Sequence, residues 1–236
     1  MGKNDGEKGL INHTNAIVIM AKSPLPNQVK TRMIPALDPS TASSLYHNFL
    51  LDKIEQVENI DAHPFIAYTP ENGADFFRSI IPPGFTLINQ VGSDLGERLR
   101  NISNHLFRQG FKKISILDSD TPNLPPEYIQ KGFERLDESD VILGPCEDGG
   151  YYLIGLRANQ PQLFMGIPWS TPGVTELTIR KAQTSGLTIC LLEKWYDIDT
   201  LEDLKHLKYD LETTSNNRKS SFFCKNTYRE ISRLDI

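Results

Sequence analysis

Basic side chains gather near the start of this 236-residue chain, and their types suggest phosphate chemistry. Lys22, Lys30 and Arg32 stand close together, and no carboxylate appears among them before Asp38. Clustered cations with nearby backbone amides are what a diphosphate or triphosphate requires. The segment, which includes Thr31, therefore predicts a phosphate-binding loop, and a solvated basic loop is the alternative. Its spacing matches neither GxxxxGK[ST] nor GxGxxG, so neither a P-loop ATPase nor a dinucleotide dehydrogenase is indicated.

Two short acidic strings could supply a metal site. Asp118 and Asp120 follow a predicted strand, and such carboxylates, together with substrate phosphates, are the ligands that Mg²⁺ or Mn²⁺ prefers. A plain turn is the alternative, because Asp often bonds nearby backbone amides. Asp197 and Asp199 form the second string. The helix cap expected at Thr200 accounts for part of it but leaves Asp197 unexplained.

The segment 144–151 carries the densest set of polar residues and glycines. Glu147 and Asp148 could accept hydrogen bonds from sugar-like hydroxyls, and Asp148 could act as a base. Gly149 and Gly150 allow a ligand close to the backbone. An ordinary turn between two strands is the alternative reading. Cys146 beside this turn is more simply a buried thiol than a nucleophile, because no histidine partner is identifiable.

Alternating apolar runs and helical stripes place these segments in a layered fold. Strands are expected at 15–20, 64–69, 85–89, 113–117, 141–143, 151–156 and 187–192, and helices at 39–57, 74–80, 95–109, 125–136, 174–184 and 201–207. This alternation predicts an α/β protein with a mostly parallel, Rossmann-like mixed sheet and helices on both faces. Ligands of such sheets bind beyond the carboxyl ends of the strands, where the polar segments lie.

Composition and length limit the domain organisation and the kinds of partner that the chain can have. We expect a polar tail over 1–14, one domain over 15–210 and a polar extension over 211–236. With 25 Lys and Arg against 30 Asp and Glu, the net charge of −5 argues against nucleic acid as a main partner. No stretch is long enough to span a membrane. Three dispersed cysteines favour a reducing, cytoplasmic compartment.

Six ordered strings together carry a resemblance. They are AKSPLPNQVKTR (21–32), DLGERL (94–99), DSDTPNLP (118–125), GPCEDGGYYLIGL (144–156), WST (169–171) and DIDTLEDL (197–204). In these strings the chain resembles a bacterial and archaeal glycosyltransferase A-type family, formerly a domain of unknown function. That family is often found with radical-SAM proteins and is sometimes named for arsenosugar biosynthesis. The resemblance runs in order from about residue 16 to 207.

The resemblance implies a nucleotide-diphospho-sugar transferase fold, whose members include sugar transferases and nucleotidyltransferases. It implies that Lys22, Lys30 and Arg32 form the basic loop, Asp120 the metal-binding aspartate and Asp199 the late aspartate. The residues expected on the acceptor side are Asp148, Gly149, Gly150 and Tyr151. The chain departs from the family pattern at Asn27 and Asp118, where glycine is usual. Asparagine tolerates the left-handed conformation better than most residues.

The resulting hypothesis is a cytoplasmic transferase that needs Mg²⁺ or Mn²⁺ and moves a sugar from a nucleotide sugar to a small hydroxylated acceptor. Its catalytic residues would be Asp148 and Lys30. The donor would be held by Lys22, Lys30, Thr31, Arg32 and Arg98. The acceptor would contact Glu147, Gly149, Gly150, Tyr151, Trp169, Ser170 and Thr171. The metal ligands would be Asp118, Asp120 and Asp199.

Two other functions remain open. One is a nucleotidyltransferase that joins a nucleoside triphosphate to a phosphorylated small molecule and releases pyrophosphate. The other is a nucleotide-binding protein without turnover. The sequence leaves the nucleotide base, the acceptor, the stereochemical outcome and the oligomeric state undetermined, and a homodimer is one of the alternatives.

Overall fold

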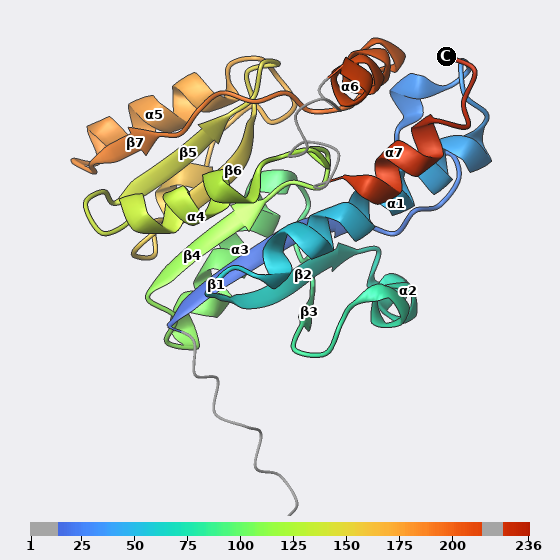
Figure 1. Ribbon diagram of the computed structural model, residues 1–236. Coiled ribbons are helices and arrows are strands. Elements are labelled where there is room, and N and C mark those ends of the chain that lie inside the picture. Colours follow the sequence, from blue (N-terminus) through green and yellow to red (C-terminus); the bar gives the residue numbers. More distant parts are fainter. Residues whose placement is uncertain (1–13, 214–223) are drawn as a thin grey trace, which may run out of the picture.

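A seven-stranded mixed sheet forms the centre of the protein (Figure 1), seen in a computed structural model that describes residues 14–213 and 224–236. The strand order is β3-β2-β1-β4-β6-β5-β7, and β6 runs antiparallel to its two neighbours while all other pairs are parallel. The strands are β1 (Asn15–Lys22), β2 (His63–Thr69), β3 (Thr86–Asn89), β4 (Lys113–Leu117), β5 (Val141–Pro145), β6 (Tyr151–Leu156) and β7 (Ile189–Leu191). The expected mostly parallel sheet is confirmed.

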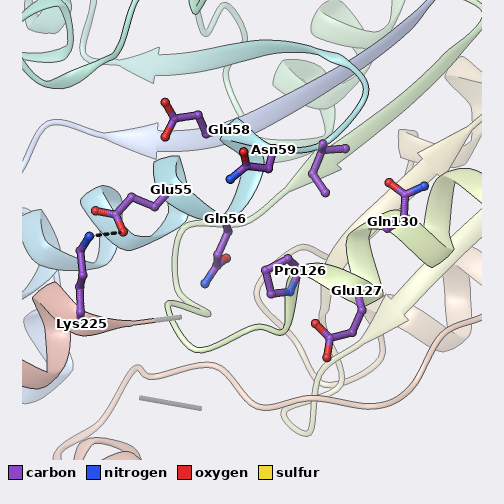
Figure 2. Close-up of a pocket in the computed structure, with 9 residues that line it drawn as sticks. Glu55, Gln56, Glu58, Asn59, Pro126, Glu127, Gln130 and Lys225 are labelled. Atoms are coloured by element: carbon purple, nitrogen blue, oxygen red, sulfur yellow. Dashed lines mark ion pairs between the residues drawn. The ribbon is translucent and has the colours of Figure 1, made fainter. Parts of the chain in front are cut away.

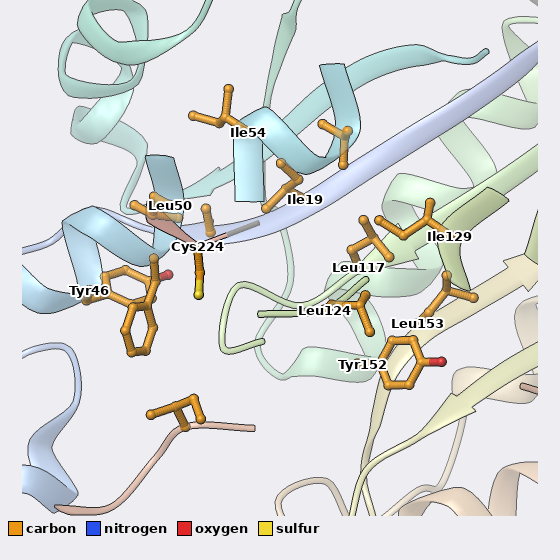
Figure 3. Close-up of a cluster of buried hydrophobic side chains, with 14 of the residues drawn as sticks. Ile19, Tyr46, Leu50, Ile54, Leu117, Leu124, Ile129, Tyr152, Leu153 and Cys224 are labelled. Atoms are coloured by element: carbon orange, nitrogen blue, oxygen red, sulfur yellow. The ribbon is translucent and has the colours of Figure 1, made fainter. Parts of the chain in front are cut away.

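Helices cover both faces of the sheet and create two apolar cores. They are α1 (Pro39–Glu58), α2 (Ala74–Ile80), α3 (Leu95–Arg108), α4 (Pro126–Arg135), α5 (Val174–Thr184), α6 (Leu201–Thr213) and α7 (Lys225–Ile231). Alternate residues of β1 serve the two cores: Ile17 and Ile19 face the core under α1 and α4, and Ala16 and Val18 face the core under α3. Figure 3 shows the first of these cores.

The predicted helix starts are confirmed where a capping side chain is present. The Asp38 carboxylate accepts hydrogen bonds from the amides of Ser40 and Thr41 at 2.9 and 3.1 Å, and Pro39 opens α1. Asp94 likewise accepts from the Glu97 amide at 2.8 Å and starts α3. These caps fix the points at which the chain leaves the carboxyl edge of the sheet.

The C-terminal part of the chain packs against its first helix. The expected boundary at residue 210 falls inside α6, and α7 lies along α1 in Figure 1. Ile231 is fully buried, and the buried Asp52 carboxylate of α1 accepts hydrogen bonds from the amides of Asn226 and Thr227 at 3.0 and 2.8 Å. The expected extension over 211–236 therefore includes a docked helix, because α7 carries an apolar side and its amides find an acceptor.

Other parts of the expected organisation fall partly beyond the described residues. The predicted tail over 1–14 and the stretch 214–223 lie outside them, apart from Thr14. Within the described residues, no helix combines the length and apolar content that crossing a bilayer requires. The three cysteines are free thiols.

Candidate functional site

A pocket of about 470 Å³ opens at the carboxyl edge of the sheet, where the loops after β1 and β4 meet. Its lining includes all of the predicted donor-binding and metal-binding residues, namely Lys22, Lys30, Thr31, Arg32, Arg98, Asp118, Asp120 and Asp199. Tyr151 and Ser170 from the predicted acceptor side also line it. The structure thus gathers residues that are far apart in the sequence around one pocket.

The Lys30 ammonium lies at the centre of this arrangement. It donates to the Asp120 carboxylate at 2.5 Å, to the Asp199 carboxylate at 3.0 Å and to the Ile198 carbonyl at 2.7 Å. The Ile198 amide in turn donates to the Asp120 carbonyl at 2.9 Å, so backbone and side chain both tie the two acidic strings together. Lys30 adopts a left-handed backbone, with φ of 48°. This conformation is uncommon for lysine and marks a constrained position.

Electrostatics hold this cluster in its charged form. Burial alone would lower the pKa of Lys30, but the carboxylates of Asp120 and Asp199 raise it above its usual value. Burial alone would also raise the pKa of Asp199, but Lys30 and then Arg32 hold it below the usual range. The side chain of Lys30 is only 2% exposed. A phosphate could therefore reach its ammonium only if a carboxylate gave way.

Asp118 has different partners from the other predicted metal ligands. Its carboxylate accepts a hydrogen bond from the Thr121 hydroxyl at 2.6 Å and lies 3.6 Å from the ammonium of the fully buried Lys53. Burial raises its pKa, despite the opposing effect of Lys53. Because these contacts face the protein interior, Asp118 stabilises the loop after β4, and its role as a metal ligand stays a prediction.

Three cations lie at the rim of the pocket, and one of them, Arg32, also pairs with the Asp199 carboxylate at 3.2 Å. Lys22 and Arg32 are exposed, and Arg98 is held by a hydrogen bond from its Nε to the Gly92 carbonyl at 3.2 Å. Gly92 is required there. Its φ is +147°, and an added Cβ would lie 2.8 Å from the Arg98 amide nitrogen. These cations, more than Lys30, are placed to meet an entering phosphate.

The predicted acceptor-side turn lies beside the pocket and forms a second polar cluster. This cluster consists of the Cys146 sulfur and one carboxylate oxygen from each of Asp148 and Asp197. These three atoms lie within 4.8 Å of one another. Burial, followed by the neighbouring Asp148 and then Asp199, raises the pKa of Asp197 to about 7. Burial and the nearby carboxylates, Asp118 first, also raise the pKa of the Cys146 thiol, which disfavours its use as a nucleophile.

The remaining predicted acceptor residues have structural contacts. Trp169 packs edge-on against Tyr151, with ring centroids 6.3 Å apart, and its indole blocks the space that a side chain at Gly96 would need. The Thr171 hydroxyl donates to the Pro168 carbonyl at 2.8 Å. Trp169 and Thr171, like the exposed Glu147, are not among the lining residues of the pocket. Their roles in substrate binding stay predictions.

Two residues that line the pocket, Tyr46 and Gln90, are not among the predicted site residues. The Tyr46 hydroxyl accepts a hydrogen bond from the Lys22 amide at 3.1 Å and forms another with the Ser119 hydroxyl at 2.8 Å. It thereby joins α1 to the loops after β1 and β4. The Gln90 amide group donates to the carbonyls of Ala21 and Ala67 at 3.1 and 2.6 Å. Tyr46 lies in a helical stripe that reads as core, and Gln90 lies in no motif. Only the position of Gln90 directly after a strand signals it.

A hollow of similar size lies elsewhere, between α1, α4 and the start of α7 (Figure 2). Carboxylates of Glu55, Glu58 and Glu127 surround it, and the Lys225 ammonium pairs with Glu55 at 3.0 Å. It contains none of the predicted site residues. Its acidic lining also suits a phosphate poorly, whereas the pocket at the carboxyl edge is lined by four basic side chains.

Comparisons with known proteins agree with this fold. A crystal structure from Desulfovibrio desulfuricans G20, assigned to the nucleotide-diphospho-sugar transferases, is 30% identical, with a TM-score of 0.84 over 95% of this chain and 99% of that one. A cytidylyltransferase from Leptospira borgpetersenii serovar Hardjo-bovis (strain JB197) is 14% identical and shares the fold, with a TM-score of 0.54 over 95% of this chain and 99% of that one.

Sequence comparison adds a relative and a family. The 2-phospho-L-lactate guanylyltransferase of Methanothermobacter thermautotrophicus (strain Delta H) is 23% identical over 179 residues, which cover 74% of this chain and 76% of that protein. The model of one protein family matches residues 51–171, from α1 through the acidic string after β4 and the acceptor-side turn to the WST string. The chain has a nucleotide-diphospho-sugar transferase fold and belongs to the family described as "Uncharacterized protein conserved in bacteria (DUF2064)".

Proposed function

We propose that this protein transfers a glycosyl group from a nucleotide sugar to a hydroxyl of a small acceptor. The observation that carries the proposal is the pocket at the carboxyl edge, which combines the exposed Lys22 and Arg32 and the half-buried Arg98 with the partly exposed carboxylate of Asp120. Cations that bind phosphate oxygens, next to a carboxylate that can bind a divalent ion, suit a donor with a diphosphate.

The Asp120 side chain fits a divalent ion. It is 39% exposed, it lines the pocket, and Lys30 engages only its Oδ1 atom, which leaves Oδ2 available. Mg²⁺ commonly binds through one or two carboxylates together with substrate phosphates. Both oxygens of Asp199 are already engaged, by Lys30 and Arg32, so Asp199 would join only after an exchange of partners. A bound Mg²⁺ or Mn²⁺ would supply charge stabilisation for the leaving diphosphate.

The charge of the acceptor side favours a hydroxyl as the acceptor. Asp148 and Asp197 lie together there, and no described basic side chain forms an ion pair with either carboxylate. Such a surface repels a phosphorylated acceptor, whereas carboxylates accept hydrogen bonds from hydroxyls. Asp148, which is exposed and accepts the Gly150 amide at 2.7 Å, is our proposed base for the acceptor proton.

Nucleotidyl transfer is the second candidate, favoured by the likeness to a guanylyltransferase over about three quarters of both chains. In that reaction a phosphate acceptor attacks a nucleoside triphosphate and pyrophosphate leaves. It needs no base, because the acceptor is already an anion. The four basic residues of the first loop and α3 would suit a triphosphate as well as a nucleotide sugar.

A panel of nucleotide sugars and nucleoside triphosphates with Mg²⁺ or Mn²⁺ tests these proposals, by thermal shift first and by product analysis second. Glycosyl transfer predicts metal-dependent stabilisation and release of a nucleoside diphosphate. Release of pyrophosphate would favour the second candidate. Asp120→Asn should abolish the metal-dependent shift, and Asp137→Asn, whose side chain is 70% exposed and pairs with Lys113 elsewhere, should not. Equal stabilisation of the protein by a nucleotide with and without the metal would indicate binding without turnover.

A further inference from the structure

The cluster of Cys146, Asp148 and Asp197 has a chemistry different from that of the nucleotide pocket. Its ligand atoms, one thiol sulfur and two carboxylate oxygens, lie within 4.8 Å of one another. Metal to sulfur and metal to oxygen distances in zinc sites are about 2.3 and 2.0–2.2 Å, so two ligands of one ion lie at most about 4.5 Å apart. Small side-chain rotations would bring all three atoms to a common ion.

The thiol is an independent sign of a ligand. Cys146 is only 5% exposed, and among the described residues its sulfur makes no hydrogen bond, yet it points at two carboxylates. A carboxylate oxygen and a thiol gain little from each other across this space unless a cation lies between them. Its side chain lies at the border between the apolar core under α1 and α4 and these two carboxylates.

The charges at the cluster are uncompensated. Two buried ammonium groups have other partners: Lys53 donates to Thr121 and pairs with Asp118, and Lys30 pairs with Asp120 and Asp199. None of the described basic side chains forms an ion pair with Asp148 or Asp197. Two neighbouring carboxylates without a counter-ion repel one another. A dication would remove this repulsion.

The backbone holds the three ligands in place before any ion binds. Trp195 donates to the Pro145 carbonyl at 3.0 Å and its own carbonyl accepts the Glu147 amide at 3.0 Å, which fixes the segment before Asp197 beside the segment that carries Cys146. Gly149 locks the turn from the other side, because its α-carbon lies against the Pro172 carbonyl. The site is therefore formed by rigid segments.

We infer that Cys146, Asp148 and Asp197 form a site for one thiophilic transition-metal dication, with Zn²⁺ as the best match to one thiolate and two carboxylates. A thiolate ligand selects zinc-like ions over Mg²⁺, which prefers oxygen ligands alone. Three protein ligands leave at least one coordination position open, and the exposed Asp148 places that position toward solvent. The site shares Asp148 with the proposed function but does not require it, because the geometry of the three ligand atoms is the same whether or not Asp148 serves as a base.

Cobalt is the probe for this site, because a thiolate bound to Co²⁺ gives a charge-transfer band in the near ultraviolet. The full chain, stripped with a chelator, should bind one equivalent of Co²⁺ with this band, and one equivalent of Zn²⁺ should displace it. Cys146→Ser should abolish the band. Asp197→Asn should weaken Co²⁺ binding by at least about tenfold. Cys190→Ser on β7 and Asp120→Asn should leave both band and affinity unchanged.

Three results would overturn the inference: a wild-type protein without the band at saturating Co²⁺, a Cys146→Ser variant that keeps it, or a Cys190→Ser variant that loses it. Asp197→Asn, which preserves the side-chain volume, covers the case in which Cys146→Ser does not fold. Nucleotide binding with Mg²⁺ is read separately by thermal shift. If the nucleotide response is lost and the cobalt band is intact, only the proposed function is contradicted. If the nucleotide response is intact and the cobalt band is missing, only this metal site is contradicted.

Discussion

Lys30 makes the pocket a structural unit before any ligand arrives. Its buried ammonium neutralises carboxylates from two distant loops. Replacing it in Lys30→Met should destabilise the protein by about 2 kcal/mol, less than the usual cost of breaking a buried pair, because Asp120 and Asp199 are partly exposed. Urea unfolding measures this. The control Lys22→Met removes an exposed ammonium and should change stability by under about 0.5 kcal/mol. Equal stability of both variants would contradict the assigned role.

Asp197 should make stability depend on pH. Burial and neighbouring carboxylates raise its pKa from 3.8 to about 7, so the folded protein retains a proton that the unfolded chain has lost. The wild type should therefore lose stability relative to Asp197→Asn as the pH rises from about 4 to 7, with no further difference above that range. With allowance for solvent screening, the change should be on the order of 1–2 kcal/mol.

Thermal unfolding of both proteins from pH 4 to pH 8 gives this difference directly. Asp137→Asn is the control, because it makes the same substitution at a carboxylate that is 70% exposed. A wild type that gains stability relative to Asp197→Asn as the pH rises would contradict the buried, repulsive environment described for Asp197.

At the scale of elements, the β5–β6 turn depends on a glycine. Gly149 has φ of +91°, and a Cβ there would lie 1.9 Å from the Pro172 carbonyl oxygen. Gly149→Ala should therefore cost more than the roughly 1–2 kcal/mol of left-handed backbone strain alone. Gly110→Ala is a matched control, since φ is +97° and nothing lies within 4 Å of its added Cβ. Similar losses for both variants in urea unfolding would refute the close packing of this turn.

Helix α7 relies on an acceptor from another helix. Cys224 at its start provides no capping side chain, and Asp52 of α1 instead receives the Asn226 and Thr227 amides. Asp52→Ala should destabilise the protein by about 1–3 kcal/mol and speed hydrogen exchange in α7. Asp75→Ala, which removes a carboxylate 93% exposed, should do neither. Unchanged exchange in Asp52→Ala would show that α7 is held by other contacts.

At the scale of the whole molecule, the two cation sites should compete in their effect on the reaction. An Asp148 carboxylate that binds an ion with its free oxygen cannot also accept a proton from the acceptor. Zn²⁺ added in the presence of Mg²⁺ should therefore inhibit transfer, and Cys146→Ser should weaken this inhibition at least about tenfold. Initial rates measured against Zn²⁺ give the result. If Zn²⁺ inhibits the wild type and Cys146→Ser equally, the inhibition does not arise from Zn²⁺ bound at Cys146, Asp148 and Asp197.

Local patterns in the sequence predict much of this architecture. Short apolar runs and helical stripes indicate the alternating elements, and Asn27 occupies the left-handed backbone, with φ of 63°, for which its residue type is suited. The polar strings also fall where strands end. The pairing of charged side chains cannot be predicted in this way, because Lys30 lies far along the chain from both carboxylates that it pairs with. Only the folded topology shows that Asp120 pairs with Lys30 while Asp118 turns toward Lys53.

The docking of α7 was hidden from the sequence for a related reason. Its seven residues are too few to give a periodic pattern, and its polar composition suggests a tail. It is held by the buried Asp52 carboxylate, by the ion pair between Lys225 and Glu55, and by an apolar side that packs mainly against α1. Short elements of this kind depend on tertiary contacts rather than on their own propensity.

The contact between the first and last helices has a consequence for synthesis of the chain. A ribosome releases α1 early, yet the Asp52 carboxylate gains these partners only when Asn226 and Thr227 have been synthesised, 174 and 175 residues later. Tyr46, on the same helix, accepts a hydrogen bond from the Lys22 amide beside the pocket at the carboxyl edge of the sheet. Docking of α7 on α1 can therefore take place only after every described strand of the sheet has been synthesised.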